Sequence, residues 1–158
     1  MRPVKLPKMD KQEIDKLINE QFLCRIAFSD EKVPYIAPFQ YVSIDGQLYF
    51  HFTNYGRKID FLKEGKPVCV EIEKYTQDLS KYSFVVLTGE LKLVTDPQEK
   101  AKAVEKMAVA GKHKRLSSNF LVAHGFSKEA DWSSLTMNKH LVIVKLENVI
   151  EKIGLKSP

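Results

Sequence analysis

The sequence predicts a mainly β protein, an antiparallel β-barrel decorated by peripheral helices. Six short runs of β-type residues are separated by turn residues, and helical periodicity appears only before the first run, after the third and after the fifth. Gly89 in the middle of the fifth run predicts a bulge or bend of the kind that barrels use to curve. No internal repeat or linker divides the chain, so residues 1–158 are expected to form a single domain.

The first third of the chain predicts one helix followed by three strands. Asp10 with Glu13 three residues later is a helix-start signature, and apolar residues then recur at helical spacing, which predicts a helix from about 11 to 21. Asp45-Gly46 between two β runs predicts a tight hairpin. The strands are expected at 23–28, 35–44 and 47–52.

The remaining elements alternate helices with strands. Asn54 is a plausible cap for a short helix over about 56–64 that ends at Gly65, and Asp96 with the following Pro97 starts a longer helix that runs to Gly111. Residues 112–139 show no clear pattern. The further strands are expected after Pro67, at 82–95 and at 140–146.

The positive charge of the chain is concentrated in one segment. Lys and Arg number 25 against 20 Asp and Glu, a net charge of +5, and residues 98–115 hold six of these cations against two Glu, or +4. Only four arginines occur, whereas nucleic-acid surfaces favour arginine forks interleaved with aromatics. A solvated helix and loop around 112–115 is therefore expected, with an anionic partner as the alternative and nucleic-acid binding unlikely on this pattern.

Several function classes find no support in the sequence. The longest apolar run is four residues, too short for a membrane helix, and the N-terminus lacks the apolar stretch of a secretory signal, so a cytoplasmic protein is expected. Cys24 and Cys69 stand alone and are expected to be reduced thiols. Metal-ligand spacing, a serine nucleophile elbow and a glycine-rich phosphate loop are all missing from the sequence.

The segment from Thr53 to Lys58 carries the chemistry. It leaves a strand, turns and enters a helix, and it combines a hydroxyl, a guanidinium and an ammonium with the unpaired amides of a helix N-terminus. Arg57 can hold a phosphate with two parallel hydrogen bonds, Lys58 adds a point charge and Gly56 permits close backbone approach. The segment is either a phosphate site or a surface cap with two solvated cations.

These motifs resemble the pyridoxamine-phosphate-oxidase-like flavin-binding split barrels. The Thr-Asn-Tyr-Gly-Arg-Lys run is similar to the segment with which such oxidases hold the phosphate of flavin mononucleotide (FMN), and Tyr-Phe-His before it is similar to the nitroimidazole-resistance-protein subgroup. The resemblance covers roughly residues 10 to 110, in the family's order and spacing. The other matching segments are 25–28, 33–39, 45–46, 67–70 and 83–89.

The resemblance implies a six-stranded split barrel that binds FMN at an intersubunit site of a homodimer. Thr53, Arg57 and Lys58 would hold the phosphate, and His51 and Phe39 would line the isoalloxazine. It also implies that Arg25 lies near the flavin and that Ser83 reaches the cofactor of the partner subunit.

Each of these residues also has a purely structural interpretation. Arg25 could pair with a carboxylate on an adjacent strand, and His51 could be a hydrogen-bonded strand histidine. Phe39 and Tyr41 could be core or dimer-interface aromatics. Trp132 could pack in a lid or an interface rather than stack near a flavin.

The expected function is an FMN-dependent oxidoreductase that reduces a small acceptor, nitroreductase-like, with NADH or NADPH as a possible electron donor. Vitamin B6 oxidation is not expected, because the chain ends in 153–158 without the Trp…Arg-Leu-x-Pro region of the true oxidases, and Gly56 replaces a serine of the family's phosphate segment. The alternatives are a deazaflavin-dependent reductase of the same fold and a flavin- or haem-binding protein without turnover.

Overall fold

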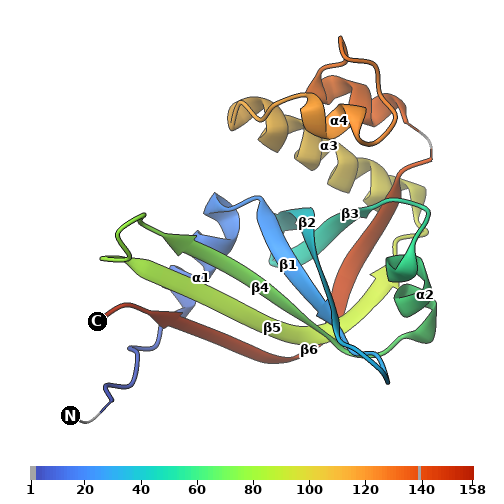
Figure 1. Ribbon diagram of the computed structural model, residues 1–158. Coiled ribbons are helices and arrows are strands. Elements are labelled where there is room, and N and C mark those ends of the chain that lie inside the picture. Colours follow the sequence, from blue (N-terminus) through green and yellow to red (C-terminus); the bar gives the residue numbers. More distant parts are fainter. Residues whose placement is uncertain (1–2, 139) are drawn as a thin grey trace.

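The computed structural model contains a closed antiparallel barrel of six strands in the order β1-β2-β3-β6-β5-β4 (Figure 1). It describes residues 3–138 and 140–158; Met1, Arg2 and Lys139, which ends the predicted patternless stretch, lie outside the described residues. The mainly β barrel expected from the sequence is confirmed. The elements are α1 (Lys11–Glu20), β1 (Leu23–Phe28), β2 (Tyr35–Ile44), β3 (Gln47–Phe52), α2 (Arg57–Glu64), β4 (Val68–Tyr75), β5 (Tyr82–Leu93), α3 (Pro97–His113), α4 (Asn119–Val122), the 3-10 helix η1 (Trp132–Met137) and β6 (Val142–Lys156).

Alternation along each strand fills the barrel. In β1 and β4 every second residue is buried, which places Ile26, Val70 and Ile72 inside with no exposed surface. Phe39 of β2 and Phe52 of β3 stack inside the barrel with their ring centroids 4.5 Å apart. The outward residues of these strands remain free to form sites on the barrel wall.

Gly89 and the last strand shape the far side of the barrel. The pairing of β5 with β6 shifts between Thr88 and Glu90, and a Cβ at Gly89 would lie 2.7 Å from the carbonyl oxygen of Glu147, so the predicted bulge is confirmed. The predicted end of the last strand at residue 146 is wrong, because β6 continues to Lys156 along the first half of β5. Its alternation is interrupted at Asn148, which has a positive φ of 50°.

The helix starts follow local capping chemistry, with one correction. Asp10 and Glu13 form a capping box at α1. Asn54 does not cap α2; the N-cap is Gly56 with a φ of 89°, and no side chain caps this helix. Gly65 ends it in the left-handed region, as predicted. None of the helices within the described ranges has both the length and the apolar character needed to cross a membrane.

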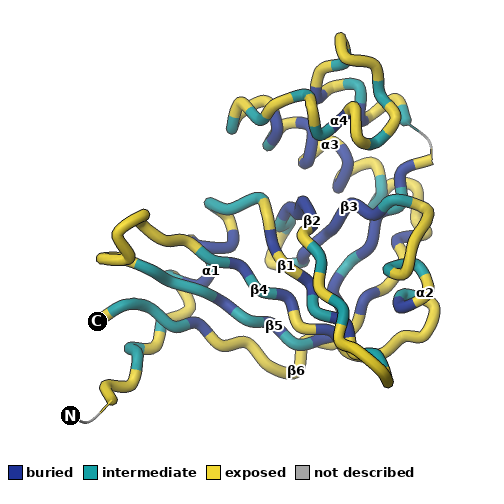
Figure 2. The backbone as a smooth tube through the Cα atoms, viewed as in Figure 1, coloured by how far each residue is buried: buried dark blue, intermediate teal, exposed yellow. Residues whose placement is uncertain are grey.

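Helices α3, α4 and η1, residues 97–137, form a helical cap on the outside of the barrel. The cap lies above β2 and β3 in Figure 1, and its inward residues are buried in Figure 2. They pack with the outward side chains of Val42, Tyr49 and Ile143 in a second hydrophobic core. The stretch from 112 that showed no pattern therefore contains the end of α3, then α4 and η1, and it folds because the barrel wall supplies its apolar partner.

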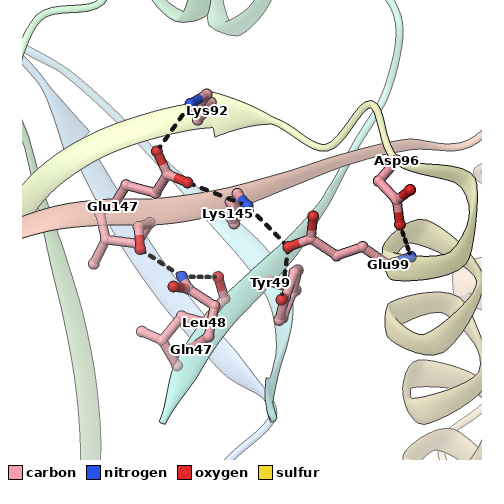
Figure 3. Close-up of polar contacts among 9 residues, drawn as sticks. Gln47, Leu48, Tyr49, Lys92, Asp96, Glu99, Lys145 and Glu147 are labelled. Carbon is pink, nitrogen blue, oxygen red and sulfur yellow. Dashed lines mark hydrogen bonds and ion pairs between the residues drawn. The ribbon is translucent and has the colours of Figure 1, made fainter. Parts of the chain in front are cut away.

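A polar network attaches the first turn of α3 to the barrel (Figure 3). The Tyr49 hydroxyl and the Lys145 ammonium both donate to Glu99 Oε1, each at 2.9 Å. Asp96 accepts from the Glu99 amide at 2.7 Å and caps the helix. Lys145 also pairs with Glu147 at 3.2 Å, so β3, β6 and α3 are held in one orientation.

Candidate functional site

The turn between β3 and α2 exposes the start of a helix. Thr53 Oγ1 lies 3.4 Å from the carbonyl oxygen of Tyr55, and Gly56 opens the helix with open space around its Cα. The Ile59 amide donates to the Gly56 carbonyl at 3.1 Å, and no side chain caps α2. This end of α2 therefore presents the amides of Arg57 and Lys58 and a partial positive charge to an incoming anion.

Lys58 adds a cation to this turn. Its ammonium lies 5.9 Å from the centroid of the Phe39 ring and 5.7 Å from that of Tyr55. Partial burial lowers its pKa, and within residues 3–138 and 140–158 it forms no ion pair. An ammonium that is partly desolvated and lacks a counter-ion favours the arrival of an anion.

Arg57 points toward another part of the chain. Its Nη2 donates to Asp30 at 2.6 Å, and its guanidinium lies over the rings of Tyr35 and Phe61, 5.2 and 5.5 Å from their centroids. Its side chain remains 56% exposed. Of the predicted phosphate ligands, Thr53 and Lys58 thus lie at the turn with no acidic partner in the described part of the chain. Arg57, in contrast, already forms an ion pair with Asp30.

His51 lies beside this turn, on the outward face of β3 under the helical cap. Its ring centroid is 4.5 Å from that of His124 in the segment after α4, and its Nδ1 has no hydrogen-bond partner. Burial lowers the pKa of His51 to about 3, with smaller contributions from His124 and Lys58. The imidazole is therefore neutral at physiological pH.

A pocket of about 320 Å³ joins His51 to the turn. The barrel contributes 51–55 to its lining and the cap side contributes 123–125, Asn138, His140 and Leu141. His124 Nδ1 donates to the carbonyl of Phe120 at 2.7 Å, which leaves its Nε2 as an acceptor in the neutral ring. The pocket therefore offers imidazole and hydroxyl groups next to the helix start and Lys58.

Phe39, Arg25 and Ser83 lie elsewhere in the isolated chain. Phe39 is 5% exposed and points into the barrel core, where only its contact with Lys58 connects it to the turn. Arg25 lies on the outer face of β1 and pairs with Glu73 and Glu71 of β4, at 2.5 and 3.4 Å.

Ser83 lies near the opposite end of β5 from the turn. Lys92 of the same strand lines a pocket with Asn54, and Ser83 lies nine positions before Lys92, or roughly 30 Å at ~3.3 Å per residue. Ser83 instead lines hollows beside α1 and the β4–β5 hairpin. A single chain therefore does not bring Ser83 to the turn.

Trp132 packs inside the cap. Its indole N–H donates to the carbonyl of Leu116 at 2.8 Å, its ring stacks on Phe120 with centroids 5.6 Å apart, and the ring lies against Gly111. Trp132 is buried by these contacts, as the packing interpretation expects.

The donor set around the turn fits a phosphorylated ring. An unpaired ammonium, an uncapped helix start and a hydroxyl suit a dianion, and the adjoining pocket with its neutral imidazole suits a planar group. Sequence reasoning missed His124, Asn138, His140 and the counter-ion Asp30. None of them shows a spacing pattern, and only the folding of the cap and of the β1–β2 loop brings them to the site.

Residues 10–128, more than half of the chain, match the family model described as pyridoxamine 5'-phosphate oxidase. No curated protein matches it.

Solved structures with the same fold include two FAD-binding proteins and a candidate antibiotic resistance protein. An FAD-binding protein from Mesorhizobium loti is 18% identical, with a TM-score of 0.69 over 98% of this chain and 100% of that one. An FAD-binding protein from Mycobacterium smegmatis is 13% identical, with a TM-score of 0.63 over 95% and 97%. A candidate 5-nitroimidazole antibiotic resistance protein from Bacteroides thetaiotaomicron is 20% identical, with a TM-score of 0.63 over 96% and 87%.

Proposed function

The chain belongs to the pyridoxamine 5'-phosphate oxidase family, and from this premise we propose that it binds FMN and reduces a small acceptor with electrons from NADH or NADPH. The observation that carries the proposal is Lys58, a partly buried ammonium without an acidic partner, placed at the uncapped start of α2. The FAD-binding proteins that share the fold add support for a flavin.

The phosphate of FMN would lie at the start of α2. Lys58 and Thr53 would donate to it together with the first-turn amides. Arg57 has five N–H donors and uses Nη2 for Asp30, so it can contact a phosphate without giving up that ion pair. The open space around Gly56 leaves the backbone accessible.

The flavin ring would lie along the neighbouring pocket that contains His51. When bound, the flavin supplies hydride transfer, while the protein supplies binding, orientation and electrostatics. Lys58 would stabilise negative charge near the ring, because no carboxylate in the described part of the chain pairs with it. Arg25 contributes less of this effect in the isolated chain, since Glu71 and Glu73 already balance its charge.

A homodimer would complete the site. The outer faces of β5 and β6 carry Phe84 and Val86 in register with Leu155 and Ile153, an apolar strip beside the Arg25 ion pairs. Such a strip would be covered by a second copy. Ser83, which is remote from the turn of its own chain, would then contribute to the site of the partner.

The test compares FMN with riboflavin, which lacks the phosphate. Lys58→Met should weaken FMN binding roughly 10- to 100-fold and leave riboflavin binding unchanged, because a hydrogen bond to a charged group contributes about 1.5–3 kcal/mol. Lys63→Met is the control, since Lys63 lies on an exposed face of the same helix. Equal losses for the two ligands in a fluorescence titration would rule out the phosphate role.

Turnover and assembly need their own measurements. Steady-state oxidation of NADH or NADPH with an added nitroaromatic acceptor tests the oxidoreductase activity, and the absorption spectrum of the purified protein distinguishes FMN from a deazaflavin or a haem. Sedimentation should give a dimer; a monomer that still holds flavin tightly would refute the intersubunit site.

A further inference from the structure

Three buried polar atoms without a partner gather on one part of the barrel wall. They are Oε1 and Nε2 of Gln40 and Nδ1 of His51, and within residues 3–138 and 140–158 no other buried side-chain nitrogen or oxygen lacks a hydrogen bond. Gln40 is 3% exposed and His51 5%. Native proteins pair nearly all such atoms, because an unpaired buried donor or acceptor loses its hydration without compensation. Gln40 and His51 therefore hold donors and acceptors that a bound ligand or an internal water would satisfy.

Both residues lie on the part of the wall that faces Phe120 of the helical cap. The paired stretch of β2 and β3 ends at Tyr41 and Phe50, and Gln40 and His51 each lie one residue beyond that end. Tyr41 and Phe50 point into the barrel core, and the alternation of side chains then directs Gln40 and His51 to the outer face. That face is the part of the wall beneath the helical cap (Figure 1).

A pocket of about 210 Å³ separates the wall from the cap at this point. Gln40 lines it together with Leu116, Ser117, Phe120 and Trp132 of the cap, and with 22–23 at the start of β1. No charged side chain lines it. A cavity of about 150 Å³ holds one benzene molecule, so this pocket accommodates a single aromatic ring rather than the three fused rings of a flavin.

The walls of the pocket are ordered aromatic surfaces. The Phe120 ring stacks on Trp132 at an interplanar angle of 15°, and it meets the His51 ring edge to face with centroids 6.2 Å apart. Phe120, which lines this pocket, thus contacts His51, which lines the pocket next to the helix start of α2.

We propose that the pocket between the barrel wall and the helical cap binds an uncharged single aromatic ring bearing a carboxamide, which pairs with the Gln40 amide. An amide offers one acceptor and two donors, and a second amide is its complement. No acidic side chain lines the pocket, so an ammonium would be buried there without a counter-charge. The binding itself does not need a flavin; only the role of this ring as a redox partner rests on the proposed function.

The experiment uses two probes of similar size. Benzamide carries the carboxamide, whereas acetophenone keeps the carbonyl and lacks the N–H donors. Titrations of the whole protein, followed by backbone amide NMR, should show benzamide binding at least about tenfold more tightly. In Gln40→Leu the two probes should bind alike, while Gln98→Leu, a change on the exposed side of α3, should keep the difference. Equal binding to the wild type, or no binding, overturns the proposal.

Thermal stability provides an independent readout. If the Gln40 amide has no partner in the free protein, Gln40→Leu or Gln40→Met should raise the melting temperature, because an apolar side chain replaces unpaired polar atoms. A lower melting temperature in both variants, without a change in probe selectivity, would show a structural amide bound to an internal water and would overturn the proposal.

Two further titrations separate this inference from the proposed function. FMN binding should be unchanged in Gln40→Leu; a protein that distinguishes the probes but does not bind FMN would leave the inference standing and refute the flavin proposal. A protein that binds FMN but not benzamide would refute this inference and leave the flavin proposal standing. Competition by NADH would identify the ring as the end of a dinucleotide, and its absence would identify a free carboxamide; both results support the pocket.

Discussion

Gly111→Ala should destabilise the protein, although glycine to alanine inside a helix usually stabilises. Gly111 lies in the last turns of α3, and a Cβ there would come within 2.6 Å of Cγ of Trp132, well below any normal contact distance. The indole cannot move away freely, because its N–H donates to the Leu116 carbonyl and its ring stacks on Phe120. Alanine therefore requires this part of the cap to repack.

The opposing free energies can be compared. Alanine gains about 1 kcal/mol of helix propensity over glycine. Overpacking costs about 1–3 kcal/mol, and displacing the indole loses a hydrogen bond of about 1 kcal/mol and an aromatic contact of about 0.5–1.5 kcal/mol. The net change is a loss of about 1.5–4.5 kcal/mol in the free energy of unfolding. This corresponds to roughly 3–18 °C in melting temperature for a chain of this size.

Urea unfolding followed by circular dichroism measures this change. Ala101→Gly, on the exposed side of the same helix, reports the propensity difference alone and should cost about 1 kcal/mol. In a Trp132→Phe background the cost of Gly111→Ala should fall by about 1 kcal/mol or more, because the smaller ring leaves room. A Gly111→Ala variant as stable as the wild type would refute the packing argument.

Three further predictions concern local stability. Asp10→Ala should lower the free energy of unfolding by about 1 kcal/mol in chemical denaturation, because it removes the capping box with Glu13. Lys145 lowers the pKa of Glu99, so the stability that this carboxylate contributes is present above its ordinary pKa of about 4.3 and is lost as the pH falls through its pKa in the folded protein. In Glu99→Gln, the free energy of unfolding measured at several pH values should therefore decrease less at acid pH than in the wild type. Burial lowers the pKa of His51 to about 3, so between about pH 6.5 and pH 3 the unfolded chain binds a proton that the folded protein excludes. The free energy of unfolding therefore decreases as the pH is lowered through this range. NMR of the imidazole should show a neutral ring at pH 5, and a charged ring would contradict this.

Local patterns predicted most of the barrel. The first three strands were placed at their observed bounds because alternation and the Asp45-Gly46 turn depend on neighbouring residues alone. The capping box of α1 and the bulge at Gly89 follow for the same reason. The second half of β6 was missed because charged residues and the positive φ at Asn148 interrupt its alternation. This segment forms a strand because it pairs with β5, which is distant in the sequence.

The candidate site divides in the same way. The turn from Thr53 to Lys58 was recognised because its donors are adjacent in sequence, whereas Asp30 reaches Arg57 only through the β1–β2 loop. Whether these residues hold FMN stays a prediction.

The sequence by itself determined the first three strands, the starts of α1 and α3 and the polar turn after β3, because each depends on interactions between residues a few positions apart. Only the tertiary structure decided that residues 97–137 cover the wall of β2 and β3, and that Gln40 and His51 are buried with three side-chain atoms that have no hydrogen-bond partner in the described residues. Burial and hydrogen-bond satisfaction depend on segments distant in the chain, and no local pattern carries that information.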